Sequence, residues 1–147
     1  MPLSFYRSTF FGFFILYAVF SGITAFHNGA EGFDGYSFLG QTWRVTDPAH
    51  ENHFYEPARP RTFVLVMSVV DKIGQTLLHR HPTINEYHVV TWILVLSTIL
   101  LWVWALKPLL NESIALLTGV LLLFHYLYFL HTAFVLADVL SSTLGLS

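Results

Sequence analysis

The sequence predicts an all-α integral membrane protein, a bundle of four transmembrane helices with a long extramembrane loop between the first and second helices. Two observations predict this fold. Of the 147 residues 54% are hydrophobic and only 11% are charged, whereas soluble domains carry about 25% charged residues. Four stretches are also long and apolar enough to cross a bilayer, which takes about 20 helical residues. We therefore treat 1–147 as one membrane domain.

The composition also limits the classes of function. The net charge is -2 and the seven Lys and Arg residues are scattered, so no basic surface is predicted that would bind nucleic acid. The chain has no cysteine, which excludes thiolate nucleophiles and cysteine-bound metals. The cysteine count does not indicate the compartment.

The first predicted span covers 9–26 and contains no charged residue. An apolar run behind a basic residue such as Arg7 also suits a signal peptide. The run is long for a signal peptide and no small-residue cleavage site ends it, so we expect the span to be retained. Ala18 and Gly22 lie four residues apart, and such a pair of small residues predicts close helix packing.

The segment 27–61 is rich in Gly, Asp, Glu, Pro and His, and is predicted to be the extramembrane loop. Its aromatic residues argue against disorder. A loop of this length is usually functional or docked, so we expect it to lie on the membrane surface or on a partner.

The second predicted span, 62–79, contains two charges, Asp71 and Lys72. A charge in mid-membrane costs about 2.5–3.5 kcal/mol on insertion scales. Both residues share one helical face with Ser68, Gln75 and His79, which predicts a span with its polar face turned inward. The alternative is an amphipathic helix that lies flat at the interface.

A polar link leads to the third predicted span, 88–107, which Pro108 ends. The fourth predicted span is 113–140, preceded by the possible helix cap Asn111. Four spans place both termini on one side, and the loop holding Arg61 on the same side as Lys107. The basic residues are too evenly divided to orient the bundle.

Eight histidines suggest a metal or haem site. Neither HExxH nor HxxHH occurs, so no metal site is predicted. His88 and His131 are expected at similar depths in the third and fourth spans, which makes them candidates for haem ligation. Their simpler interpretation is as polar residues near helix ends, and we predict no cofactor.

Asp71 and His125 are expected at similar depths in the second and fourth spans. We predict that they form a buried pair, within a buried polar group that includes Lys72 and Gln75. Such a pair either determines which helices of the bundle pack together or has a function. No nucleophile elbow or phosphate-binding loop occurs, so the residues alone predict a non-catalytic scaffold or subunit.

Two short motifs resemble those of a known family. Their residues are Arg61, Thr62 and Phe63 at the start of the second span, and Tyr87, His88 and Trp92 at the start of the third. In the ergosterol biosynthetic protein 28 family, small four-span proteins of the endoplasmic reticulum, A-R-T-F-G and Y-H-x-x-x-W stand at these places. The chain resembles a divergent member, because Pro60 and Val64 replace the family's Ala and Gly. Alternatively, Thr62 simply caps a helix at the interface.

The resemblance implies a non-catalytic scaffold that gathers sterol C4-demethylation enzymes on the endoplasmic reticulum membrane, with membrane proteins and lipids as its partners. Two other assignments stay open. One is an accessory subunit of a respiratory or ATP synthase complex in the mitochondrial inner membrane, which the small size and lack of catalytic motifs also suit. The other is a haem- or quinone-binding membrane anchor that uses His88 and His131.

Overall fold

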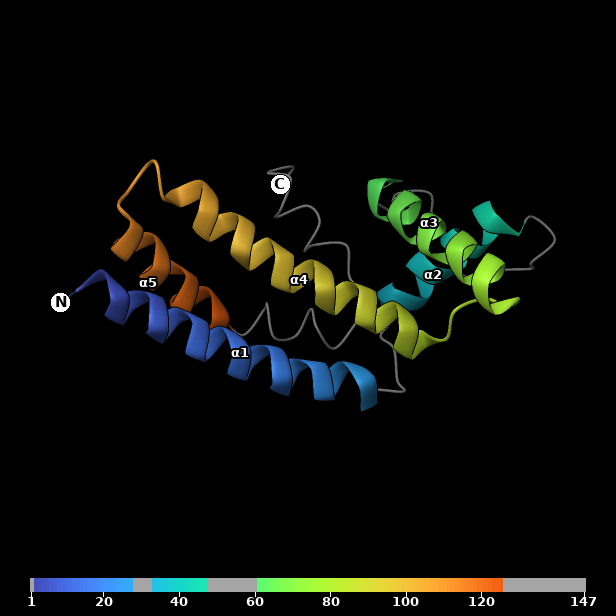
Figure 1. Ribbon diagram of the computed structural model, residues 1–147. Helices are drawn as coiled ribbons and strands as arrows, with labels where there is room; N and C mark the ends of the chain where they lie inside the picture. The colour runs from blue at the N-terminus through green and yellow to red at the C-terminus, as the bar shows by residue number, and fades with distance from the viewer. Residues whose placement is uncertain (1, 28–32, 48–60, 126–147) are drawn as a thin grey trace.

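The computed structural model describes residues 2–27, 33–47 and 61–125, and these residues form five helices and no strand (Figure 1). The helices are α1 (Leu3–His27), α2 (Phe33–Thr46), α3 (Arg61–Leu78), α4 (Ile84–Leu106) and α5 (Glu112–Leu123). The all-α prediction is confirmed for this part of the chain.

Two of the described helices are long and apolar enough to cross a bilayer. They are α1, with 25 residues, and α4, with 23. At about 1.5 Å of rise per residue, each exceeds the roughly 30 Å of a bilayer's hydrocarbon core. The other described helices do not meet this test, so the structure does not show four spans. Helix α5 is apolar but short, and residues 126–140 of the predicted span 113–140 lie outside the described residues.

Two helices begin several residues earlier than predicted, and one further helix was not predicted. Helix α1 begins six residues earlier than predicted, and α4 begins at Ile84 instead of 88. A capping box explains the second difference, since the Thr83 hydroxyl accepts from the Glu86 backbone and the Glu86 carboxylate accepts from the Thr83 N–H. The prediction that 27–61 is a loop throughout is wrong, because α2 forms within it. Helix α2 buries Leu39 against α3, and such packing stabilises a short helix.

Helices α1, α4 and α5 form one bundle (Figure 1). Its core residues are Phe10, Val95, Ile99, Val103, Leu116 and Leu123. Gly119 lets the three helices approach closely, since a Cβ atom there would lie 2.5 Å from Val103 Cγ2 and 2.6 Å from Phe10 Cε2. The predicted packing role of Gly22 agrees with its contact to the Trp92 ring, 3.2 Å from an added Cβ. Ala18 lines a shallow apolar groove beside it.

The two ends of the bundle show that α1 and α4 run antiparallel. At one end Arg7 Nη2 lies 2.9 Å from Glu112 Oε2, and Lys107 Nζ lies 3.1 Å from Glu112 Oε1. At the other end Asn85 Nδ2 donates to the Phe26 carbonyl, 3.2 Å away. The prediction that Arg7 and Lys107 lie on opposite sides is wrong, because both contact the same carboxylate.

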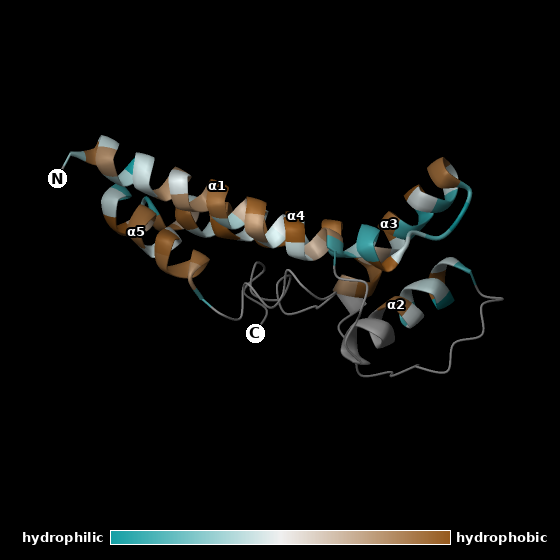
Figure 2. Cartoon of the chain, turned by 90° about the horizontal axis from the view of Figure 1, so that it is seen from below, coloured by the Kyte–Doolittle hydropathy of each residue, from teal (hydrophilic) through white to brown (hydrophobic). Residues whose placement is uncertain are grey.

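The hairpin of α2 and α3 lies at the end of the bundle where α4 begins (Figures 1 and 2). Leu39, Phe63, Val64, Met67 and Tyr87 form its core. Tyr87 belongs to α4, so this second core joins the hairpin to the bundle.

The ion pairs at Glu112 predict a dependence of stability on pH. Hydrogen bonds from Arg7 and Lys107 lower the pKa of Glu112 from 4.5 to about 2. A lowered pKa stabilises the fold above pH 4.5, and this contribution is lost as the pH falls from 4.5 towards 2. We expect the unfolding midpoint in non-ionic detergent to fall over this range, and to fall less in Glu112→Gln. An equal fall of the unfolding midpoint with pH in the two proteins would contradict the ion pairing.

Candidate functional site

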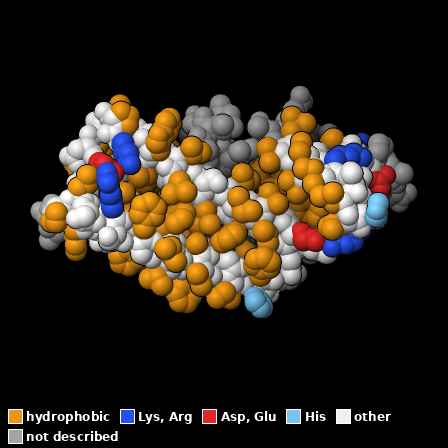
Figure 3. Space-filling view, in the orientation of Figure 1, with side chains coloured by type: hydrophobic (Ala, Val, Ile, Leu, Met, Phe, Trp, Pro, Cys, Tyr) orange, Lys and Arg blue, Asp and Glu red, His pale blue; other side chains and the backbone are white. Residues whose placement is uncertain are grey.

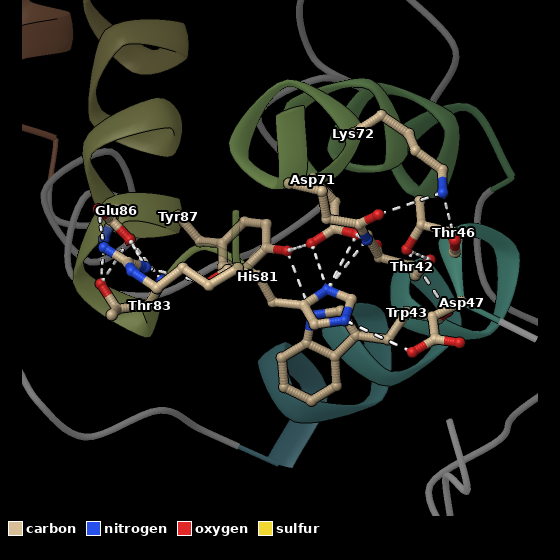
Figure 4. Close-up of polar contacts among 12 residues, drawn as sticks. Thr42, Trp43, Thr46, Asp47, Asp71, Lys72, His81, Thr83, Glu86 and Tyr87 are labelled. Atoms are coloured by element: carbon tan, nitrogen blue, oxygen red, sulfur yellow. Dashed lines mark hydrogen bonds and ion pairs between the residues drawn. The ribbon is translucent and has the colours of Figure 1, made fainter. Parts of the chain in front are cut away.

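The most buried charged group among the described residues is the carboxylate of Asp71 in α3, whose side chain is 0% exposed. Side chains from several segments hydrogen-bond to it, including Thr46 of α2 (Figure 4). The Tyr87 hydroxyl donates to Oδ1 over 2.6 Å, and Gln75 Nε2 donates to Oδ2 over 2.7 Å. His81 Nδ1 lies 2.9 Å from Oδ1, a hydrogen bond when this nitrogen carries the proton. Burying a carboxylate is costly unless such partners satisfy it.

Local sequence features bring these groups together. Asp71 and Gln75 lie one turn apart on α3. Tyr87 lies in the first turn of α4, which the capping box fixes. The connection carrying His81 folds back closely onto α3 at Gly74, where a Cβ atom would lie 2.5 Å from the Pro82 ring. A glycine is therefore needed at this position.

Helix α2 closes the other side of the cluster. Trp43 Nε1 donates to the Tyr87 hydroxyl over 3.2 Å, and the indole ring lies edge-on to the His81 ring, with centroids 6.2 Å apart. Lys72 Nζ donates to the Thr46 carbonyl in the last turn of α2. A cation at this place also suits the negative end of the helix dipole. The polar contacts therefore join all three helices of this region.

The predicted buried polar group is correct in part. Asp71 is buried and Gln75, which is half-buried, contacts it. Lys72 is exposed, so its predicted burial is wrong; its long side chain instead runs across the surface to α2. The predicted pair of Asp71 and His125 is also wrong. His125 is exposed just after α5, and α5 packs on α1 and α4 rather than on α3.

The motif residues occupy different places. Phe63, Tyr87 and His88 are buried, whereas Trp92 is half-buried and donates to Ser21 Oγ over 3.0 Å. Arg61 and Thr62 form the first turn of α3, and their side chains lie outside the described set. His131, the other haem candidate, also lies outside the described residues.

The sequence interpretation missed His81 and Trp43 as members of the cluster. A signal for His81 was available, because the Thr83-x-x-Glu86 capping box shows that the N-cap of α4 lies two residues after it. A helix starting there places Tyr87 and His81 close to the end of α3. No comparable local signal marks Trp43, whose position depends on how α2 packs.

The hydrogen bonds of the cluster join helices to one another, and the carboxylate at its centre is not open as in an active site. The carboxylate is inaccessible to solvent, and its hydrogen bonds go to other residues of the chain. Within the described ranges, no group of three or more His, Asp or Glu side chains is arranged to hold a metal ion.

No family model, curated protein or solved structure matches the chain. The resemblance to the ergosterol biosynthetic protein 28 family therefore stays a prediction based on its two motifs.

Proposed function

We propose that this chain is a non-catalytic membrane scaffold that holds sterol-modifying enzymes together on the endoplasmic reticulum membrane. The sterol enzymes and the endoplasmic reticulum in this proposal come from the resemblance of the two motifs, whereas the observation that supports a scaffold role is how Asp71 is bonded. An ionisable residue in an apolar chain is a functional candidate by default, yet here its partners are Tyr87, Gln75 and His81. Its role is to hold the α2–α3 hairpin on α4 in a fixed position. A rigid hairpin on a membrane anchor suits a protein that other proteins bind.

The proposal includes a membrane topology. Helices α1 and α4 cross the bilayer antiparallel. The contact between Asn85 and the Phe26 carbonyl supports this topology, because it requires the chain between α1 and α4 to leave and re-enter on the same side. A single crossing by α3 between them is incompatible with that contact. We therefore propose that α3 does not cross the bilayer and that the hairpin lies on one membrane face.

Purification of the full-length tagged chain from its native membranes in mild detergent tests the function. We expect sterol C4-demethylation enzymes to be recovered with it. Asp71→Ala should recover less of them, because the hairpin is no longer held on α4, while Gly12→Ala should match the unaltered chain. A Cβ atom at Gly12 meets nothing within 4 Å, which makes it a suitable control.

Two other outcomes would contradict the proposal. Co-migration with a respiratory or ATP synthase complex on a native gel would assign the chain as an accessory subunit of that complex. A Soret band in the purified protein would assign it as a haem-binding anchor.

A further inference from the structure

The outer side of α3 carries a row of exposed apolar side chains. Leu65 and Val69 are each 60% exposed, Ile73 is 52% exposed and Leu77 is 72% exposed. These residues follow one another at intervals of four, so they form one line along the helix. An apolar row of this kind on a rigid element marks a surface that meets lipid or another protein.

The opposite side of α3 prevents the row from turning inward. Met67 and Asp71 are 0% exposed on that side, and Gly74 packs against Pro82. Rotating α3 to bury the row would break the hydrogen bond between Tyr87 and Asp71. The row is therefore fixed in place by the buried cluster.

The charge around the row suits a lipid leaflet. Among residues 63–78, whose side chains the structure describes, Asp71 and Lys72 are the only charged residues, and Asp71 is buried. The stem of Lys72 lines a shallow groove of about 540 Å³ together with Val69, Ile73 and Val45 of α2. Lysine stems lie along apolar surface while the ammonium group stays among headgroups and water. The outer side thus presents apolar groups, the hydroxyl of Thr76 and one positive charge.

The position of α3 places this row near the boundary of the bilayer. Helix α3 joins the start of α4, where polar groups gather, including the ion pair of Arg80 with Glu86 at 2.8 Å. Figure 3 shows apolar side chains over the bundle and continuing over the region of the hairpin. The apolar surfaces of the crossing helices and of α3 therefore form one continuous face, and the crossing helices must meet lipid.

We propose that α3 is an in-plane membrane anchor, with Leu65, Val69, Ile73 and Leu77 inserted among the acyl chains of the phospholipid leaflet at the start of α4. This use fits an amphipathic helix of the interfacial kind. The inference rests on the proposed crossing by α1 and α4, but it does not depend on the scaffold role. It means that lipid, as well as the Asp71 cluster, fixes the height and tilt of the hairpin.

Nitroxide labelling of the full-length protein tests this inference, since the chain has no native cysteine. Each row residue is replaced singly by cysteine, labelled, and reconstituted in vesicles of phosphatidylcholine and phosphatidylglycerol. His79→Cys, at an exposed position just beyond α3, is the water-side control. Ile15→Cys in α1 and Leu101→Cys in α4, both exposed apolar positions, are the bilayer controls.

We expect the ratio of collisions with oxygen to collisions with a water-soluble nickel complex to be several-fold higher along the row than at His79. Ratios along the row equal to that at His79, with high ratios at Ile15 and Leu101, would overturn the inference alone and indicate that the row faces water. Low ratios at Ile15 and Leu101 as well would overturn both the inference and the proposed crossing.

Discussion

Replacing Asp71 by alanine is expected to lower the free energy of unfolding by about 3 kcal/mol, because each buried polar group left without its partner costs about 1–3 kcal/mol. The groups that lose their acceptor are the Tyr87 hydroxyl and the Gln75 amide. The hairpin should come loose from α4 before the bundle unfolds, since its polar contacts to α4 are centred on this carboxylate. The midpoint of unfolding by SDS in mixed micelles measures the loss.

Two further variants separate the contribution of the cluster from general damage. Tyr87→Phe keeps the ring and removes only the hydroxyl, so it should cost about 1–2 kcal/mol. Thr76→Ala changes an exposed residue of α3 whose hydroxyl bonds only within its own helix, and it should leave the midpoint unchanged. A midpoint for Asp71→Ala equal to that of Thr76→Ala would show that the carboxylate does not hold the hairpin.

Adding side-chain atoms at Gly119 should produce the other large effect. In Gly119→Ala the new methyl group would lie 2.5 Å from Val103 Cγ2 and 2.6 Å from Phe10 Cε2, so α5 has to move away from α1 and α4. Overpacking of this kind costs about 1–3 kcal/mol, and Gly119→Leu should cost more. Thermal unfolding in detergent measures the change.

Gly12→Ala is the matched control for Gly119→Ala. It makes the same chemical change in a helix of the same bundle, where the added Cβ atom meets nothing within 4 Å. We expect no loss of stability there. Equal unfolding temperatures for the two alanine variants would contradict the close contact of the three helices at Gly119.

The helices that the sequence predicted well are those with a strong local signal. The long apolar runs at 9–26 and 88–107 correspond to α1 and α4. The polar stripe that includes Asp71 indicated a helix over 62–79, and α3 covers this range except for His79, which lies beyond its end. Helix α2 was missed because its residues resemble a loop in composition, and what stabilises it is Leu39 packed against α3. Such a contact between distant segments leaves no local pattern.

The partners of Asp71 were also not predicted from the sequence. Equal depth in an assumed four-span bundle suggested His125, but depth along a helix does not determine which helices are neighbours. The actual partners, His81 and Tyr87, lie 10 and 16 residues away in the chain. The capping box at Thr83 is the local feature from which their positions could have been predicted. The flat-helix alternative for 62–78 also follows from the sequence, and the proposed anchor uses it.

The most direct test of the scaffold proposal measures whether two client enzymes bind each other through this chain. One sterol C4-demethylation enzyme is purified from membranes of cells with and without the chain, and the amount of a second such enzyme recovered with it is quantified. The proposal predicts that this recovery falls sharply when the chain is deleted and returns when the unaltered chain is restored. Recovery that is the same with and without the chain would contradict the proposal.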